Sequence, residues 1–125
     1  MDEQDFDPSA LQLLAAELGV DEARGLADRF RVVGRDLVRQ IEEAAGAGDV
    51  PNWQRLAHGL KSAAAALGLT SISTMCHDIE LACQRRAVDE AKPLTARLPI
   101  SFQAAIATLD RHAAWLDGGS PGAPA

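Results

Sequence analysis

One histidine stands out for the chemistry that its neighbours allow. His58 opens the segment His-Gly-Leu-Lys-Ser, so Lys61 follows one helical turn later, and four alanines come after Ser62. A neutral imidazole nitrogen is a nucleophile, and histidine is the side chain that changes charge near neutral pH. A lysine one turn away can place positive charge beside transferring oxygens. These residue types therefore suit the acceptance of a phosphoryl group.

That arrangement requires residues 50–67 to form a helix. At about 100° per residue, apolar side chains gather on one face and His58 falls on the opposite side. The buried face is predicted to contain Trp53, Leu56, Leu60, Ala63, Ala64 and Leu67. The residues around the histidine are short or polar, which leaves room for the backbone of a partner protein. The predicted docking surface consists of Gln54, Gly59, Ser62, Ala65, Ala66 and Gly68.

The rest of the chain predicts an all-α fold without strands. Alanine and leucine dominate, tyrosine is absent, and apolar residues recur every three or four positions. In the second helix the predicted buried stripe is Leu26, Phe30, Val33, Leu37, Ile41 and Ala44. The predicted helix starts, in chain order, are Asp7 with Pro8, Asp21, Asp49, Thr70 or Ser71, and Asp89.

Glycines mark the predicted helix ends, and the resulting loops are short. Gly19, the segment 46–48 and Gly68 end the first three helices, with Gly68 in a left-handed turn. Pro99 predicts a kink or a short break in the last helix. We therefore expect an antiparallel up-down four-helix bundle, with the short N-terminal helix lying across one end.

Composition limits the possible functions of the chain. A length of 125 residues predicts one domain, which we place at residues 1–117, followed by a disordered tail of Gly, Pro, Ser and Ala at 118–125. Lys and Arg number 12 against 18 Asp and Glu, a net charge of −6, which argues against nucleic acid. No apolar run approaches the roughly 18 residues of a membrane span, and no secretion signal is evident. We expect a cytoplasmic protein.

The two cysteines fit that location. Cys76 and Cys83 are seven positions apart on one predicted helix, so their Cα atoms would lie about 10 Å apart, too far for a disulfide. A metal site that combines them with His77 is disfavoured, because Cys76 and His77 diverge by about 100° on a helix. We expect buried thiols and no metal. His77 and His112 are expected to be solvated surface residues.

The histidine segment resembles the signature of histidine phosphotransfer (HPt) domains, His-x-Leu-Lys-Gly followed by small residues and a glycine. Further stretches resemble the same family. Phe6-Asp7-Pro8 is similar to its usual opening and Gly48-Asp49 to the step before its active helix. The run from Met75 to Glu80 looks like its Leu-Cys-x-x-Leu-Glu segment. The resemblance covers nearly the whole chain except the tail.

The resemblance implies a phosphocarrier without ATP-dependent kinase activity of its own. His58 would accept a phosphoryl group from the aspartate of a receiver domain and pass it to another receiver aspartate. Lys61 would supply charge near the phosphate, Glu80 would orient the imidazole, and Gly68 would mark the turn that closes the active helix. The implied partners are response-regulator receivers and a hybrid sensor histidine kinase; magnesium would come from the receiver, and a monomer is expected.

Two points stay open at the level of sequence. Ser62 stands where the family commonly has glycine, and its hydroxyl could bond to the imidazole or the phosphate and change the rate of transfer. The chain could also be an HPt-like adaptor that binds a receiver or kinase without carrying phosphate. The presence of both His58 and Lys61 favours the phosphocarrier, because an adaptor has no chemical need for them. A haem-binding bundle is disfavoured, because no inward-facing His or Glu pairs are predicted.

Overall fold

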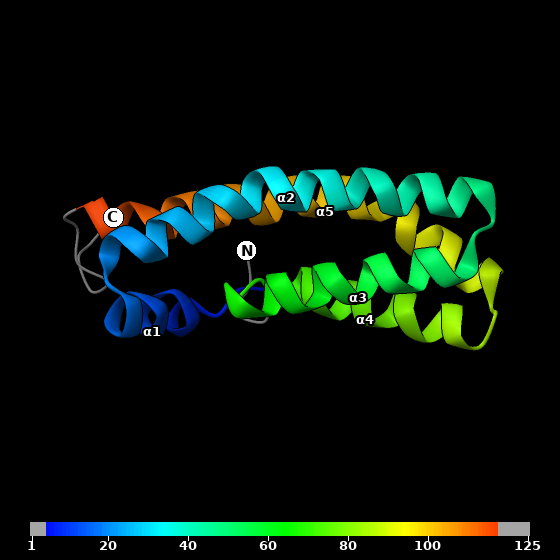
Figure 1. Cartoon of the computed structure of the whole chain (residues 1–125), viewed down its shortest axis with the longest axis horizontal. Helices are drawn as coiled ribbons and strands as arrows, with labels where there is room; N and C mark the ends of the chain where they lie inside the picture. The colour runs from blue at the N-terminus through cyan, green and yellow to red at the C-terminus, as the bar shows by residue number, and fades with distance from the viewer. Residues whose placement is uncertain (1–4, 118–125) are drawn as a thin grey trace.

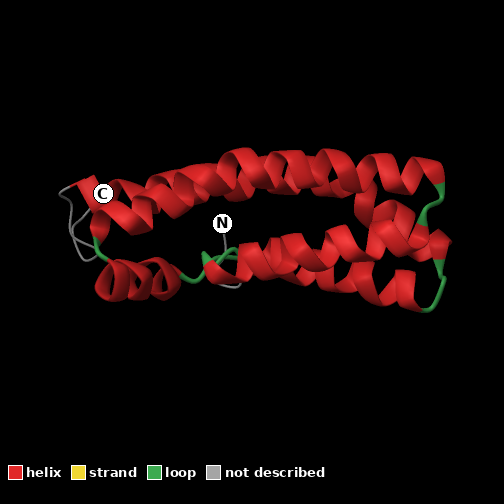
Figure 2. Ribbon diagram, viewed as in Figure 1, coloured by secondary structure: helices red, strands yellow, loops and turns green. Residues whose placement is uncertain are grey.

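Five α-helices and a short 3-10 helix make up most of residues 5–117, the part of the chain that this computed structural model describes. Their bounds are α1 Pro8–Leu18, α2 Val20–Ala47, α3 Val50–Ala66, α4 Thr70–Gln84, α5 Val88–Ala113 and η1 Ala114–Asp117. Figure 2 shows the helices joined by short loops, and no strand occurs in the described range. The all-α prediction is confirmed; the tail predicted at 118–125 lies outside the described residues.

The helices α2, α3, α4 and α5 form the bundle, because each contacts the next and α5 closes the ring against α2. Figure 1 shows α2 and α5 running the full length of the molecule, with α3 and α4 covering only part of it. The remaining length is filled by α1, which packs on α2 roughly in line with α3. With 28 residues, α2 is about 42 Å long, whereas the 17 residues of α3 reach about 26 Å. The expectation that the first helix lies across one end is therefore wrong: it runs along the bundle.

Side-chain caps form at two of the predicted helix starts. The carboxylate of Asp7 accepts from the backbone N–H of Ser9 at 3.0 Å, and that of Asp49 accepts from Asn52 at 3.3 Å. The caps predicted at Asp21 and at Thr70 or Ser71 are wrong: α2, α4 and α5 begin after Gly19, Leu69 and Ala87, and no side-chain cap forms at these three starts. Asp21 and Asp89, the acidic residues predicted at the starts of α2 and α5, lie in the first turn, where they complement the helix dipole.

The buried face of α2 is rotated from the predicted stripe. Val33 is 47% exposed, while Gly34 and Val38 are buried. The reason is the packing of Phe102 over Gly34: a Cβ at position 34 would lie 2.7 Å from the Phe102 ring. A glycine therefore occupies the centre of the core face because an aromatic ring from α5 needs the space.

Two prolines lie inside α5 without interrupting it. Pro93 and Pro99 both fall within the continuous helix, so of the kink or short break expected near Pro99 the break is absent. Each proline removes one backbone donor. The side chains of Leu98 and Phe102, which flank Pro99, are buried in the core and hold this part of the helix in place.

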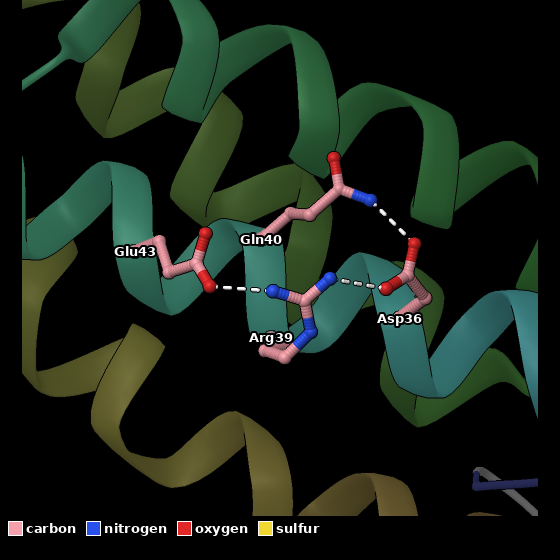
Figure 3. Close-up of polar contacts among 4 residues, drawn as sticks. All are labelled: Asp36, Arg39, Gln40 and Glu43. Atoms are coloured by element: carbon pink, nitrogen blue, oxygen red, sulfur yellow. Dashed lines mark hydrogen bonds and ion pairs between the residues drawn. The ribbon is translucent and has the colours of Figure 1, made fainter.

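The solvent-facing side of α2 carries charge pairs at helical spacing. In Figure 3, Arg39 bridges Asp36 and Glu43, and Gln40 donates to Asp36 at 2.6 Å. The hydrogen bonds from Arg39 and then Gln40 lower the pKa of Asp36. Such exposed pairs add little to the stability of the fold, because water screens the charges. They identify this surface as the solvated side of the bundle. Within residues 5–117, none of the helices combines the length and the hydrophobicity that a membrane span requires.

Candidate functional site

His58 lies near the middle of α3 and points away from the core. Its side chain is 59% exposed, whereas Trp53, Leu56 and Leu60 on the same helix are buried. The indole N–H of Trp53 donates to the Thr95 hydroxyl at 3.0 Å and links the start of α3 to α5 inside the core. The helix is therefore fixed in rotation, and the histidine faces outward as the wheel predicted.

A carboxylate from α4 connects the histidine to the lysine. Oε2 of Glu80 lies 2.8 Å from Nδ1 of His58, and Oε1 accepts from Nζ of Lys61 at 2.6 Å. Because a carboxylate only accepts hydrogen bonds, the first contact requires the imidazole proton on Nδ1. In the neutral ring the lone pair of His58 is then on Nε2, the nitrogen turned away from Glu80. The geometry thus leaves one ring nitrogen available to an incoming electrophile.

Glu80 keeps its negative charge although its side chain is buried. Its residue is only 8% exposed, and burial by itself raises the pKa of a carboxyl group. The hydrogen bonds from Lys61 and then from His58 outweigh this effect, so that the pKa of Glu80 is lowered overall. At neutral pH the group between the two α3 side chains is a carboxylate.

The two cysteines of α4 are buried and take no part in the surface around His58. Cys76 and Cys83 are both buried and unbridged, and burial raises the pKa of Cys76 to about 12. His77, next in sequence to Cys76, is exposed. Within residues 5–117, no three His, Cys, Asp or Glu side chains come together in a way that could hold a metal ion.

The surface around His58 contains most, but not all, of the predicted docking residues. Gly59, Ser62, Ala65 and Ala66 are exposed, and Gln54 is partly so. Gly68 is buried, with φ at +79°, and a Cβ there would lie 2.2 Å from the Asp7 carbonyl oxygen. Its place in the predicted docking surface is therefore wrong, since the segment before α1 covers it.

An apolar groove that sequence analysis missed adjoins this surface. It encloses about 220 Å³ between α1, α2 and α3. Its lining residues are Leu14, Leu26, Arg29, Phe30, Val33, Ala63, Ala66 and Leu67. Because Ala66 belongs both to the groove and to the exposed surface beside His58, the two are continuous. Three separate helices build the groove, so no single-helix pattern could reveal it.

The other two histidines differ from each other. His77 is exposed, as expected. His112 is partly buried, and its ring packs on Phe6 with the ring centroids 4.4 Å apart. Burial, together with the nearby charge of Arg111, lowers the pKa of His112. The expectation that His112 is solvated is wrong, because the segment before α1 covers it.

Comparison with known protein families identifies the family of this chain. The family model described as "Hpt domain" matches residues 25–115, which include His58, Lys61 and Glu80. The N-terminal segment, with α1 and the Phe6-Asp7-Pro8 stretch, lies outside the match. Searches of curated proteins and of solved structures found no match. The matched region spans most of the chain and all of α3 and α4, and on this basis the chain belongs to the Hpt domain family of histidine phosphotransfer proteins in two-component phosphorelays.

Proposed function

We propose that His58 accepts a phosphoryl group from the aspartyl phosphate of a receiver domain and passes it to an aspartate of another receiver. The observation that carries this proposal is the Glu80 carboxylate, whose Oε2 lies 2.8 Å from Nδ1 of His58 while the His58 side chain stays 59% exposed. A histidine held in one tautomer with an accessible second nitrogen is a prepared nucleophile.

In the proposed step, the Nε2 lone pair of His58 attacks phosphorus from the side opposite the aspartyl oxygen. The N–P bond forms as the P–O bond breaks, and the electron pair leaves with the aspartate carboxylate. No proton moves, because Nε2 carries none while Nδ1 donates to Glu80. Lys61 stabilises charge on the phosphoryl oxygens as it spreads in the transition state. Transfer onward to a second receiver is the reverse of this step.

The surroundings of His58 suit a protein donor. Exposed residues without long side chains, such as Gly59, Ser62 and Ala65, let a receiver backbone come within bonding reach of the ring. The apolar groove next to Ala66 offers a site for an apolar side chain of the receiver. We expect magnesium to be supplied by the receiver, and we expect this chain to be a phosphocarrier without a cofactor or kinase activity of its own.

The test is to incubate the protein with phosphorylated receiver domains and look for label that is labile in acid and stable in base. Wild type should be labelled, H58Q should not, and H77Q should be labelled like wild type. H58Q is expected to fold normally because the side chain lies outside the core. Label in H58Q at the wild-type level would refute the assignment. Receiver binding without any label would identify an adaptor.

A further inference from the structure

A hollow of about 450 Å³ lies on one side of the imidazole, toward the start of α3. It is lined by Pro51, Gln54, Arg55, His58 and Glu80. Lys61 does not line this hollow. A group bonded to Nε2 of His58 would therefore have the lysine toward one side and the hollow with Arg55 toward the other.

The two cations near His58 differ in their partners. The ammonium of Lys61 lies 2.6 Å from the Glu80 carboxylate, so much of its positive charge is neutralised within the protein. The guanidinium of Arg55 donates to the side-chain oxygen of Asn52, which is neutral, and no carboxylate of the described residues pairs with it. A phosphoryl group brings about two negative charges. Of these two cations, Arg55 is therefore the one whose positive charge is not balanced by a carboxylate of the described residues.

We propose that Arg55 is a second cation of the transfer reaction and binds the oxygens of the phosphoryl group on His58 Nε2. This inference rests on the proposed function. Arg55 and His58 are three positions apart on α3, so their Cβ atoms lie about 5–6 Å from each other and both side chains reach the hollow. A guanidinium donates two parallel hydrogen bonds to phosphate oxygens, whereas an ammonium acts as a point charge. Arg55 only donates hydrogen bonds, and it neither gains nor loses a proton in the step.

The same contact has a consequence after transfer. A guanidinium next to phosphohistidine favours the dianion of the phosphoryl group over the monoanion, which lowers the pKa of the phosphoryl group. Removal of the charge raises that pKa. A unit charge at about 6 Å in water corresponds to a rise of about 0.5 in the pKa. A residue that only supported the fold would not change this titration.

The experiment uses phosphoramidate, a small phosphodonor, so that no partner protein is needed. The variants are R55Q and R55K, and the matched control is R35Q, an exposed arginine on α2 that lines a separate hollow. The rate of His58 labelling is measured against donor concentration. The phosphorylated proteins are then titrated by phosphorus NMR, and circular dichroism melting checks the fold.

We expect R55Q to be labelled about fivefold more slowly at low ionic strength, with a smaller deficit at high salt. Its phosphohistidine should titrate at a higher pH than that of wild type. R55K should recover part of both effects, and R35Q should match wild type. An R55Q protein that equals wild type in rate or in titration would overturn the inference while leaving His58 as the acceptor. Absence of label on His58 in wild type would overturn the proposed function itself.

Discussion

Replacing Glu80 with alanine removes the carboxylate that contacts both His58 and Lys61. Hydrogen bonds to charged groups contribute about 1.5–3 kcal/mol when they are shielded from water. His58 is 59% exposed, so water competes for its Nδ1 proton, and we assign about 1–1.4 kcal/mol to the orientation of the ring. With 1.36 kcal/mol equal to a factor of ten, E80A should transfer phosphate about five- to tenfold more slowly than wild type.

Glutamine at position 80 separates orientation from charge. Its amide oxygen can still accept from Nδ1 of His58, so E80Q should stay within about twofold of the wild-type rate. The measurement is single-turnover labelling of His58 at saturating phosphodonor, with circular dichroism melting as the check on folding. The control is E42A, which removes an exposed carboxylate from α2. A well-folded E80A with the wild-type rate would refute the orienting role, and an E80Q as slow as E80A would assign the effect to charge.

The stability difference between wild type and E80Q should depend on pH, and the sign of this dependence follows from the pKa of Glu80. Burial raises this pKa, but the bonds from Lys61 and His58 outweigh burial and lower it overall. The carboxylate therefore contributes stability above the ordinary pKa of glutamate, and that contribution is lost as the pH falls through the lowered value. The difference in unfolding free energy between wild type and E80Q should shrink over this acidic range. A constant difference would contradict the argument.

Three further predictions concern the lysine, the docking surface and the turn. K61A should slow transfer by about tenfold without abolishing it, because the lysine stabilises charge while the histidine forms the bond; unchanged kinetics would leave it a surface charge. A65E should keep helicity and melt within a few degrees of wild type, yet lose most receiver binding, whereas A107E on the exposed side of α5 should bind normally. G68A should lose about 2 kcal/mol or more of stability by denaturant unfolding, while G46A, where a Cβ meets nothing, should lose none.

The sequence was most informative where one helix determines the answer. The outward position of His58 follows from the periodicity of α3 alone, because large apolar residues fill the opposite face and nothing competes for it. In α2 the same reasoning placed the buried face at the wrong angle around the helix axis, because Gly34 and not Val33 faces the bundle interior. A helical wheel ranks positions by hydrophobicity. It contains no information on the packing of the Phe102 ring against position 34, where a Cβ would not fit.

Features that depend on several helices could not be predicted in this way. The link from Glu80 to His58 and Lys61 was suggested by family resemblance, and the structure adds its geometry across α3 and α4. Gly68 was expected at the surface because nothing in its own helix covers it. It is covered by Asp7, about 60 positions earlier in the chain, and such a contact has no local pattern.

The segment that covers Gly68 connects the N-terminus to the geometry of the site. The backbone N–H of Asp7 donates to the Gly68 carbonyl at 2.7 Å, and that of Ser71 donates to the Asp5 carbonyl at 3.2 Å. These bonds hold the turn that joins α3, which carries the histidine, to α4, which carries Glu80. The distance between imidazole and carboxylate depends on how these two helices lie against each other. Asp5 and Asp7, which lie outside the family match, therefore help to fix how α3 lies against α4, and with it the distance between His58 and Glu80.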